Sequence, residues 1–152
     1  MIRSVKVLVS LGALLITPSL QAEPFENAAE AVEYRQNAFS MIRANFGVLA
    51  GMARNEIPFN ADEAKTRAQA VYHLSYIPWQ GFVGMGENAY EGTEALPGIW
   101  QNKADFNNKA EALRSAAKEL VEATESGSMN TIRPKFMAVA RSCQQCHEQY
   151  RD

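Results

Sequence analysis

The chain has 152 residues, 47% of them hydrophobic and 21% charged, which fits one globular domain and excludes intrinsic disorder and collagen-like repeats. Its formal net charge of -2, from 15 basic and 17 acidic side chains, leaves no positive surplus to neutralise phosphates, so no nucleic acid partner is expected. Two cysteines are too few for a disulfide framework, and with two histidines they barely suffice for one zinc site.

Residues 1–22 are typical of a cleavable secretory signal peptide. Arg3 and Lys6 form a basic start, an apolar stretch over 7–16 follows, and Ala22 ends the approach to a cleavage site. The apolar stretch is too short to cross a bilayer, which needs about 20 residues. The sequence therefore predicts export to the periplasm, with no membrane attachment after cleavage. Cleavage removes two positive charges, so the mature domain, 23–152, has a formal charge of -4.

The first half of the mature chain carries two segments with helical periodicity. In the segment 26–55, apolar residues such as Phe39 and Ile42 fall on one stripe of a helix. The segment 61–77 keeps the same period and is stopped by Pro78. Both segments are therefore predicted to be amphipathic helices.

The second half begins with a predicted loop and ends with two more helices. The loop, 78–100, contains five of the nine glycines. The segments 101–125 and 131–150 both have an apolar stripe, and Pro134 is tolerated if it lies in the first turn of the last helix. Since no strand pattern of useful length is present, the sequence predicts an all-α fold, an antiparallel four-helix bundle.

The motif that carries chemistry is Cys143-Gln-Gln-Cys146-His147, a C-x-x-C-H sequence. Two thiols at this spacing add to the two vinyl groups of haem, and the adjacent imidazole falls beneath the iron as an axial ligand. Export agrees with this chemistry, because such haems are attached outside the cytoplasm. The sequence therefore predicts one haem c per chain, covalently attached through Cys143 and Cys146, with His147 as the iron ligand.

Other readings of the two cysteines have less support. A thioredoxin-like C-x-x-C needs a βαβ context, which is missing from the pattern. A zinc site needs two more ligands, and His73 is the only other histidine. A disulfide within one helix is disfavoured, because the Cβ atoms of Cys143 and Cys146 point apart.

A second axial ligand would have to come from upstream, since only five residues follow His147. Met41 and Met52 are predicted on the side of the first helix away from its apolar stripe, Met85 lies in the glycine-rich loop, and His73 is off the stripe of the second helix. We infer a five-coordinate, high-spin haem with an apolar distal pocket. The alternative is a low-spin haem with a methionine ligand.

Arg35 lies on the apolar stripe of the first helix. A buried guanidinium is costly unless it is paired, and its forked donors suit carboxylates. Pairing with a haem propionate is therefore predicted. The alternative is that Arg35 extends to the end of the bundle with its stem packed.

The whole mature chain resembles the cytochrome c′ family. The resemblance implies a left-handed antiparallel four-helix bundle, a homodimer, His147 as proximal ligand and a vacant distal site. It is carried by the segments 32–36 (Val-Glu-Tyr-Arg-Gln), 45–47 (Asn-Phe-Gly), 77–79 (Ile-Pro-Trp), 97–100 (Pro-Gly-Ile-Trp) and 143–151, which holds the haem motif.

The resemblance also implies haem contacts for further residues. Phe39 matches the position over the distal iron, where other members often carry leucine. We hypothesise that its bulkier ring restricts bound gases by size and access. The other implied contacts are Arg35, Gln36, Thr93, Glu94, Trp79 and Phe82.

The expected function is NO binding, with CO as a second ligand, as a periplasmic NO sink or carrier. The alternative is electron transfer, in which an acidic surface docks a basic redox partner protein. An enzyme is not expected, because the distal stripe offers no acid or base. Met41, Leu49 and Met52 are predicted on an outer flank of the first helix, which would suit the homodimer interface.

Overall fold

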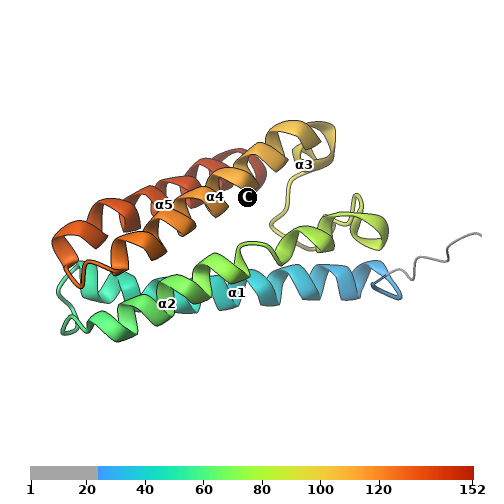
Figure 1. The fold of residues 1–152 in the computed structure, drawn as a ribbon. Coiled ribbons are helices and arrows are strands. Elements are labelled where there is room, and N and C mark those ends of the chain that lie inside the picture. The colour runs from blue at the N-terminus through green and yellow to red at the C-terminus, as the bar shows by residue number, and fades with distance from the viewer. Residues whose placement is uncertain (1–23) are drawn as a thin grey trace, which may run out of the picture.

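The structure, a computed structural model, describes residues 24–152, so the predicted signal peptide lies outside the described residues. Within residues 24–152 the chain folds into four long helices and three short ones (Figure 1). The long helices are α1 (Ala28–Ala53), α2 (Ala61–Leu74), α4 (Lys103–Thr124) and α5 (Met129–Tyr150). The short ones are the 3-10 helices η1 (Pro78–Phe82) and η2 (Gly84–Gly86) and the single turn α3 (Gly98–Gln101).

Asparagine side chains start three of the long helices. The side chain of Asn27 accepts a hydrogen bond from the backbone N–H of Glu30, and that of Asn60 accepts one from Glu63. Asn102 does the same at the start of α4. Each bond satisfies one of the free N–H groups that a helix leaves at its first turn.

The long helices form two antiparallel hairpins. A turn over 54–60 joins α1 to α2, and a shorter one over 125–128, with Gly127 at φ +60°, joins α4 to α5. Figure 1 shows the hairpins close together at the end with these turns and further apart at the other end, where η1, η2 and α3 lie. The predicted all-α, antiparallel four-helix bundle is confirmed.

The main hydrophobic core lies toward the end of the bundle where the two hairpins are close together. Phe46 of α1 stacks on Phe136 of α5 with 4.5 Å between ring centroids. Burying such side chains stabilises the fold by about 1.5–3 kcal/mol each. The largest fully buried hydrophobic side chains of this core are Leu49, Val71, Leu120, Ile132 and Val139.

The segment between the hairpins is more ordered than the predicted loop. The second helix was expected to run to residue 77, but α2 ends at Leu74, where the Ser75 hydroxyl donates to the carbonyl of Tyr72. Pro78 then starts η1, because its fixed φ suits a first helical position. The loop predicted from the glycines of the segment 78–100 is therefore only partly correct, because the same glycines also allow the tight 3-10 turns η1 and η2.

The last helix begins two residues earlier than predicted, at Met129, so Pro134 lies in its second turn and the expectation of a first-turn proline is wrong. Proline leaves the carbonyl of Asn130 without its helical donor. Asn130 is exposed, so water can satisfy that carbonyl.

Two of the three residues expected on an outer flank of α1 are buried. Leu49 and Met52 are 1% and 2% exposed, and only Met41 is exposed. The prediction from helical angle was wrong because α1 packs against α2 as well as against α5, the helix that carries the C-x-x-C-H motif. These residues therefore give no support for a dimer interface. Within residues 24–152, no helix combines the length and apolar character needed to cross a bilayer.

Candidate functional site

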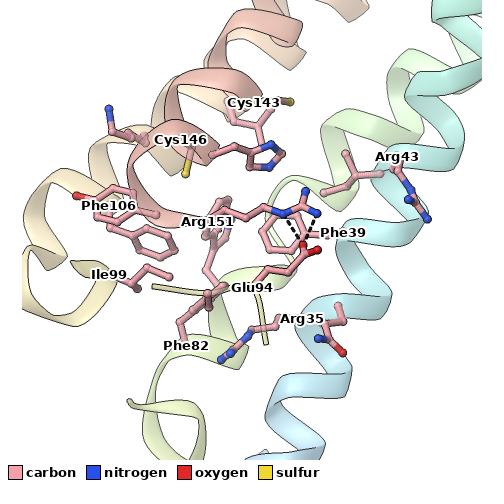
Figure 2. A pocket seen from close by; sticks show the side chains of 18 of the residues that line it. Arg35, Phe39, Arg43, Phe82, Glu94, Ile99, Phe106, Cys143, Cys146 and Arg151 are labelled. Carbon is pink, nitrogen blue, oxygen red and sulfur yellow. Dashed lines mark hydrogen bonds and ion pairs between the residues drawn. The ribbon is translucent and has the colours of Figure 1, made fainter. Parts of the chain in front are cut away.

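A cavity of about 970 Å³ opens where the two hairpins diverge, lined by α1, α4, α5, η1, the segment 92–95 and Ile99 of α3 (Figure 2). This volume is at the upper end of the range for cofactor and ligand pockets. The structure brings all ten predicted site residues to its walls. They are Arg35, Gln36, Phe39, Trp79, Phe82, Thr93, Glu94, Cys143, Cys146 and His147.

The α5 wall carries the C-x-x-C-H motif. Because residues three and four apart share one face of a helix, Cys143, Cys146 and His147 all border the cavity. Before haem is attached, burial raises the pKa of the Cys143 thiol and raises that of the Cys146 thiol to about 11. Burial and the nearby Arg151 lower the pKa of His147, which favours the neutral imidazole that binds a metal.

The opposite wall is aromatic. Phe39 of α1 meets the ring of Trp79 edge-on, with centroids 5.8 Å apart at 85°, and lies 6.4 Å from Phe82. The indole N–H of Trp79 donates to the carbonyl of Ser75 at 2.6 Å. The Phe39 ring therefore faces the cavity, and it has no atom that could bind a metal.

Arg35 is 2% exposed and borders the same cavity. Its Nη1 donates to the carbonyl of Gly81 at 2.7 Å, its Nη2 donates to the carbonyl of Ala89, and its guanidinium lies 4.4 Å from the centre of the Phe82 ring. Burial lowers its pKa. The alternative in which Arg35 extends to the end of the bundle is therefore wrong.

Glycine at position 81 allows this contact. A Cβ there would lie 2.5 Å from the carbonyl oxygen of Ala31 and 2.8 Å from Cβ of Arg35, closer than real Cβ atoms come. The segment that holds Trp79 and Phe82 can therefore lie directly on α1, which brings both aromatic rings to the cavity.

A short clasp joins the segment 94–96 to the end of α5. The N–H of Leu96 donates to the carbonyl of Tyr150 at 3.0 Å, and that of Asp152 donates to the carbonyl of Glu94 at 2.9 Å. The side chains add an ion pair, in which Nε of Arg151 lies 2.6 Å from Oε2 of Glu94 (Figure 2). The clasp holds Glu94 and Arg151 at the cavity.

Tyr150 fixes the end of α5 to α4. Its hydroxyl donates to the carboxylate of Asp105 at 2.7 Å, and its ring meets Phe106 edge-on at 5.4 Å. Burial, followed by the bond to Asp105, raises the pKa of Tyr150 to about 12. Since Tyr150 lies three residues after His147, this anchor also restrains the imidazole-bearing turn.

Sequence reasoning did not select several other lining residues as site residues, among them Arg43, Ile99, Phe106 and Lys109. Arg43 could have been found, because it follows Phe39 by four residues and shares its face of α1. Phe106 is on the apolar stripe of its helix, but nothing in that pattern separates a cavity wall from ordinary core.

The residues present fit a haem. The cavity has two thiols and an imidazole on one wall, apolar rings on the other and a buried cation, and no ion pair within residues 24–152 includes Arg35. An unpaired buried guanidinium suits a group that brings its own carboxylates. The upstream iron-ligand candidates do not line the cavity. They are Met41, Met52, Met85 and His73.

Comparison with known proteins agrees with this site. The sequence pattern of the family described as Cytochrome C' matches residues 30–151. The chain is 32% identical over 127 residues to cytochrome c' from Alcaligenes xylosoxydans xylosoxydans, covering 84% of this chain and 97% of that protein.

Solved structures give the same result. The chain is similar to cytochrome c prime from Shewanella frigidimarina, with a TM-score of 0.80, 42% identity, and coverage of 84% of this chain and 98% of that one. It is also similar to the nitric oxide complex of a variant of cytochrome c prime from Alcaligenes xylosoxidans, with a TM-score of 0.77, 30% identity and coverage of 84% and 98%. The chain belongs to the cytochrome c′ family, and its cofactor is haem c.

Proposed function

We propose that the chain is a periplasmic NO-binding protein, an NO sink or carrier, in which His147 is the only protein ligand of a five-coordinate haem iron. The observation that carries the proposal is the asymmetry of the cavity: His147 lies on one wall, and Phe39 lies on the other with no methionine or second histidine among the described lining residues. The NO complex of a relative supports the same ligand.

When bound, the haem would supply an iron that can bind NO or, alternatively, CO. The chain's own residues hold the group in place. Cys143 and Cys146 attach it, and the anchor from Tyr150 to Asp105 restrains the turn that carries His147. With the group fixed at both cysteines, it cannot dissociate in an exported protein.

We assign Arg35 to the carboxylates of the haem, and we propose that Gln36 and Thr93, which line the same cavity, contact the haem. Arg35 has five N–H donors, two of its nitrogen atoms already bind carbonyls, and its burial leaves any carboxylate in the cavity as the natural partner of its charge. The hydroxyl of Thr93 donates to the carbonyl of Tyr90, which fixes this residue at the cavity edge. Glu94 contributes through its ion pair with Arg151.

Phe39 is the proposed filter for gas ligands. Its ring is held among Trp79 and Phe82, so a ligand that reaches the iron from the α1 side has to displace it. Close-packed aromatic rings resist such displacement. The filter restricts ligands by size and access rather than by hydrogen bonding.

Electron transfer to a redox partner protein is the second candidate function, and the -4 charge of the mature chain favours a basic partner. We do not propose enzyme activity, because the rings of Phe39, Trp79 and Phe82 carry no carboxylate or imidazole that could act as a general acid or base. We propose a homodimer on the family resemblance alone.

Two measurements test the proposal. The intact mass of the exported protein should equal residues 23–152 plus one haem, which tests the cleavage and the attachment together. NO titration of the reduced protein should saturate at one NO per chain. A protein that carries haem but takes up no NO would favour electron transfer instead.

A further inference from the structure

Neighbouring residues contact the Trp79 side chain on several sides, and the cavity borders only one side of it. Its N–H donates to the carbonyl of the fully buried Ser75 at 2.6 Å. Its ring lies edge-on to Phe106 at 5.6 Å and edge-on to Phe39 at 5.8 Å. The indole therefore has a fixed position from which it limits the movement of Phe39.

Arg114 of α4 holds Trp79 from outside the cavity. Its guanidinium lies 5.7 Å from the centre of the Trp79 ring and 5.1 Å from that of Tyr76, so it contacts both aromatic faces. Arg114 is not among the cavity-lining residues, whereas Trp79 is. The arginine thus contacts the filter through Trp79.

The polar contacts of Arg114 agree with this role. Its side chain is 19% exposed and pairs with Glu111, whose side chain is 67% exposed. Its Nε is buried and has no hydrogen-bond partner. A cation close to the face of an aromatic ring is attracted by the ring's electron density, so the two rings stabilise the Arg114 guanidinium where it has no oxygen partner.

We propose that Arg114 is a positioning residue for gas entry, which restrains Phe39 by holding Trp79 in place. The inference rests on the proposed function, because it concerns the ligand for which Phe39 is the filter. Arg114, which lies on the far side of Trp79 and outside the haem cavity, then partly sets the rate of NO entry.

The test is the NO association rate constant of the reduced holoprotein, measured by stopped flow. Arg114→Met keeps the packing of the stem but removes the cation, and it should raise the rate about threefold, which corresponds to about 0.7 kcal/mol. Arg114→Lys should restore part of the restraint. Lys118→Met is the matched control, because Lys118 lies on the same helix, is exposed and is paired only with Glu122.

A double mutant separates this role from a general loss of stability. If Arg114 acts through Phe39, then Arg114→Met should change the rate by less than about 1.5-fold when Phe39 is already alanine. Thermal unfolding of each variant checks that the bundle is intact. Since Arg114→Met keeps an apolar stem in place of the arginine stem, we expect a folded holoprotein.

The outcomes are distinct. A threefold increase that disappears in the Phe39→Ala background supports the proposal. An unchanged rate in Arg114→Met, with Phe39→Ala still faster than the wild type, overturns it and leaves the proposed function intact. An equal increase in both backgrounds also overturns it. If no variant binds NO, the proposed function fails, and the inference fails with it.

Discussion

Glu94 and Arg151 form an ion pair at the haem cavity, with 2.6 Å between Nε of Arg151 and Oε2 of Glu94. Arg151 follows His147 by four residues. The side chains of Arg151 and Glu94 are 49% and 64% exposed, so the pair contributes no more than about 1 kcal/mol to stability. Its larger effect is electrostatic, because it places two opposite charges beside the iron ligand.

The first prediction follows from these charges. A cation near the iron favours the ferrous state and an anion favours the ferric state, so Arg151→Gln should lower the reduction potential and Glu94→Gln should raise it. Because solvent screens both charges, we expect each substitution to shift the reduction potential by about 10–50 mV. Spectroelectrochemistry measures both. Shifts of the same sign would show that the variants act by disrupting the clasp, not through their charges.

The second prediction concerns the buried Arg35. Arg35→Gln should destabilise the holoprotein by about 2–4 kcal/mol, because the carbonyls of Gly81 and Ala89 lose charge-assisted donors. Arg35→Lys should recover little, since one ammonium lacks the fork that reaches both segments. Urea unfolding measures the loss. An Arg35→Gln variant within about 0.5 kcal/mol of wild type would contradict this account.

The third prediction concerns ligand selection. Phe39→Ala should speed or strengthen CO binding, because the ring that narrows the α1 side of the cavity is removed. CO titration of the reduced protein and recombination after flash photolysis give the affinity and the rate. Tyr72→Phe is a suitable control, because Tyr72 does not line the cavity. Unchanged CO affinity and rate in Phe39→Ala would remove Phe39 from the filter.

The fourth prediction is a pH dependence from Tyr150. Its pKa rises to about 12 in the folded chain from an ordinary value near 10, so its hydroxyl stabilises the fold fully below pH 10 and progressively less between pH 10 and 12. Urea unfolding at pH 8 and pH 11.5 should show a loss about 1–2 kcal/mol smaller in Tyr150→Phe than in wild type. Equal losses would mean that Tyr150 is not the titrating group.

Local patterns predicted the parts of this protein that depend on local sequence. The spacing of Cys143, Cys146 and His147 defined the chemistry because one face of one helix holds all three. Helical periodicity predicted the four long helices, with ends wrong by up to three residues. The cap residue Asn60 marked the start of α2 correctly, whereas the breaker Pro78 placed its end three residues too late, because the chain leaves the helix at Leu74.

Contacts between distant segments could not be derived in the same way. The stripe of α1 showed that Arg35 faces inward, but not that the carbonyls of Gly81 and Ala89 accept its hydrogen bonds. Helical angle placed Met52 outside because it considered one neighbouring helix, whereas the fold packs several around α1. The bracing of Trp79 by Arg114 depends on the same long-range packing.

We propose that the haem iron has an open position on the Phe39 side of the cavity. The most direct measurement is the optical spectrum of the purified mature protein, reduced with dithionite, before and after NO is added. We expect a high-spin ferrous spectrum that changes when NO is added. A sharp low-spin spectrum that NO leaves unchanged would show that a side chain already occupies the open position, and it would contradict the account.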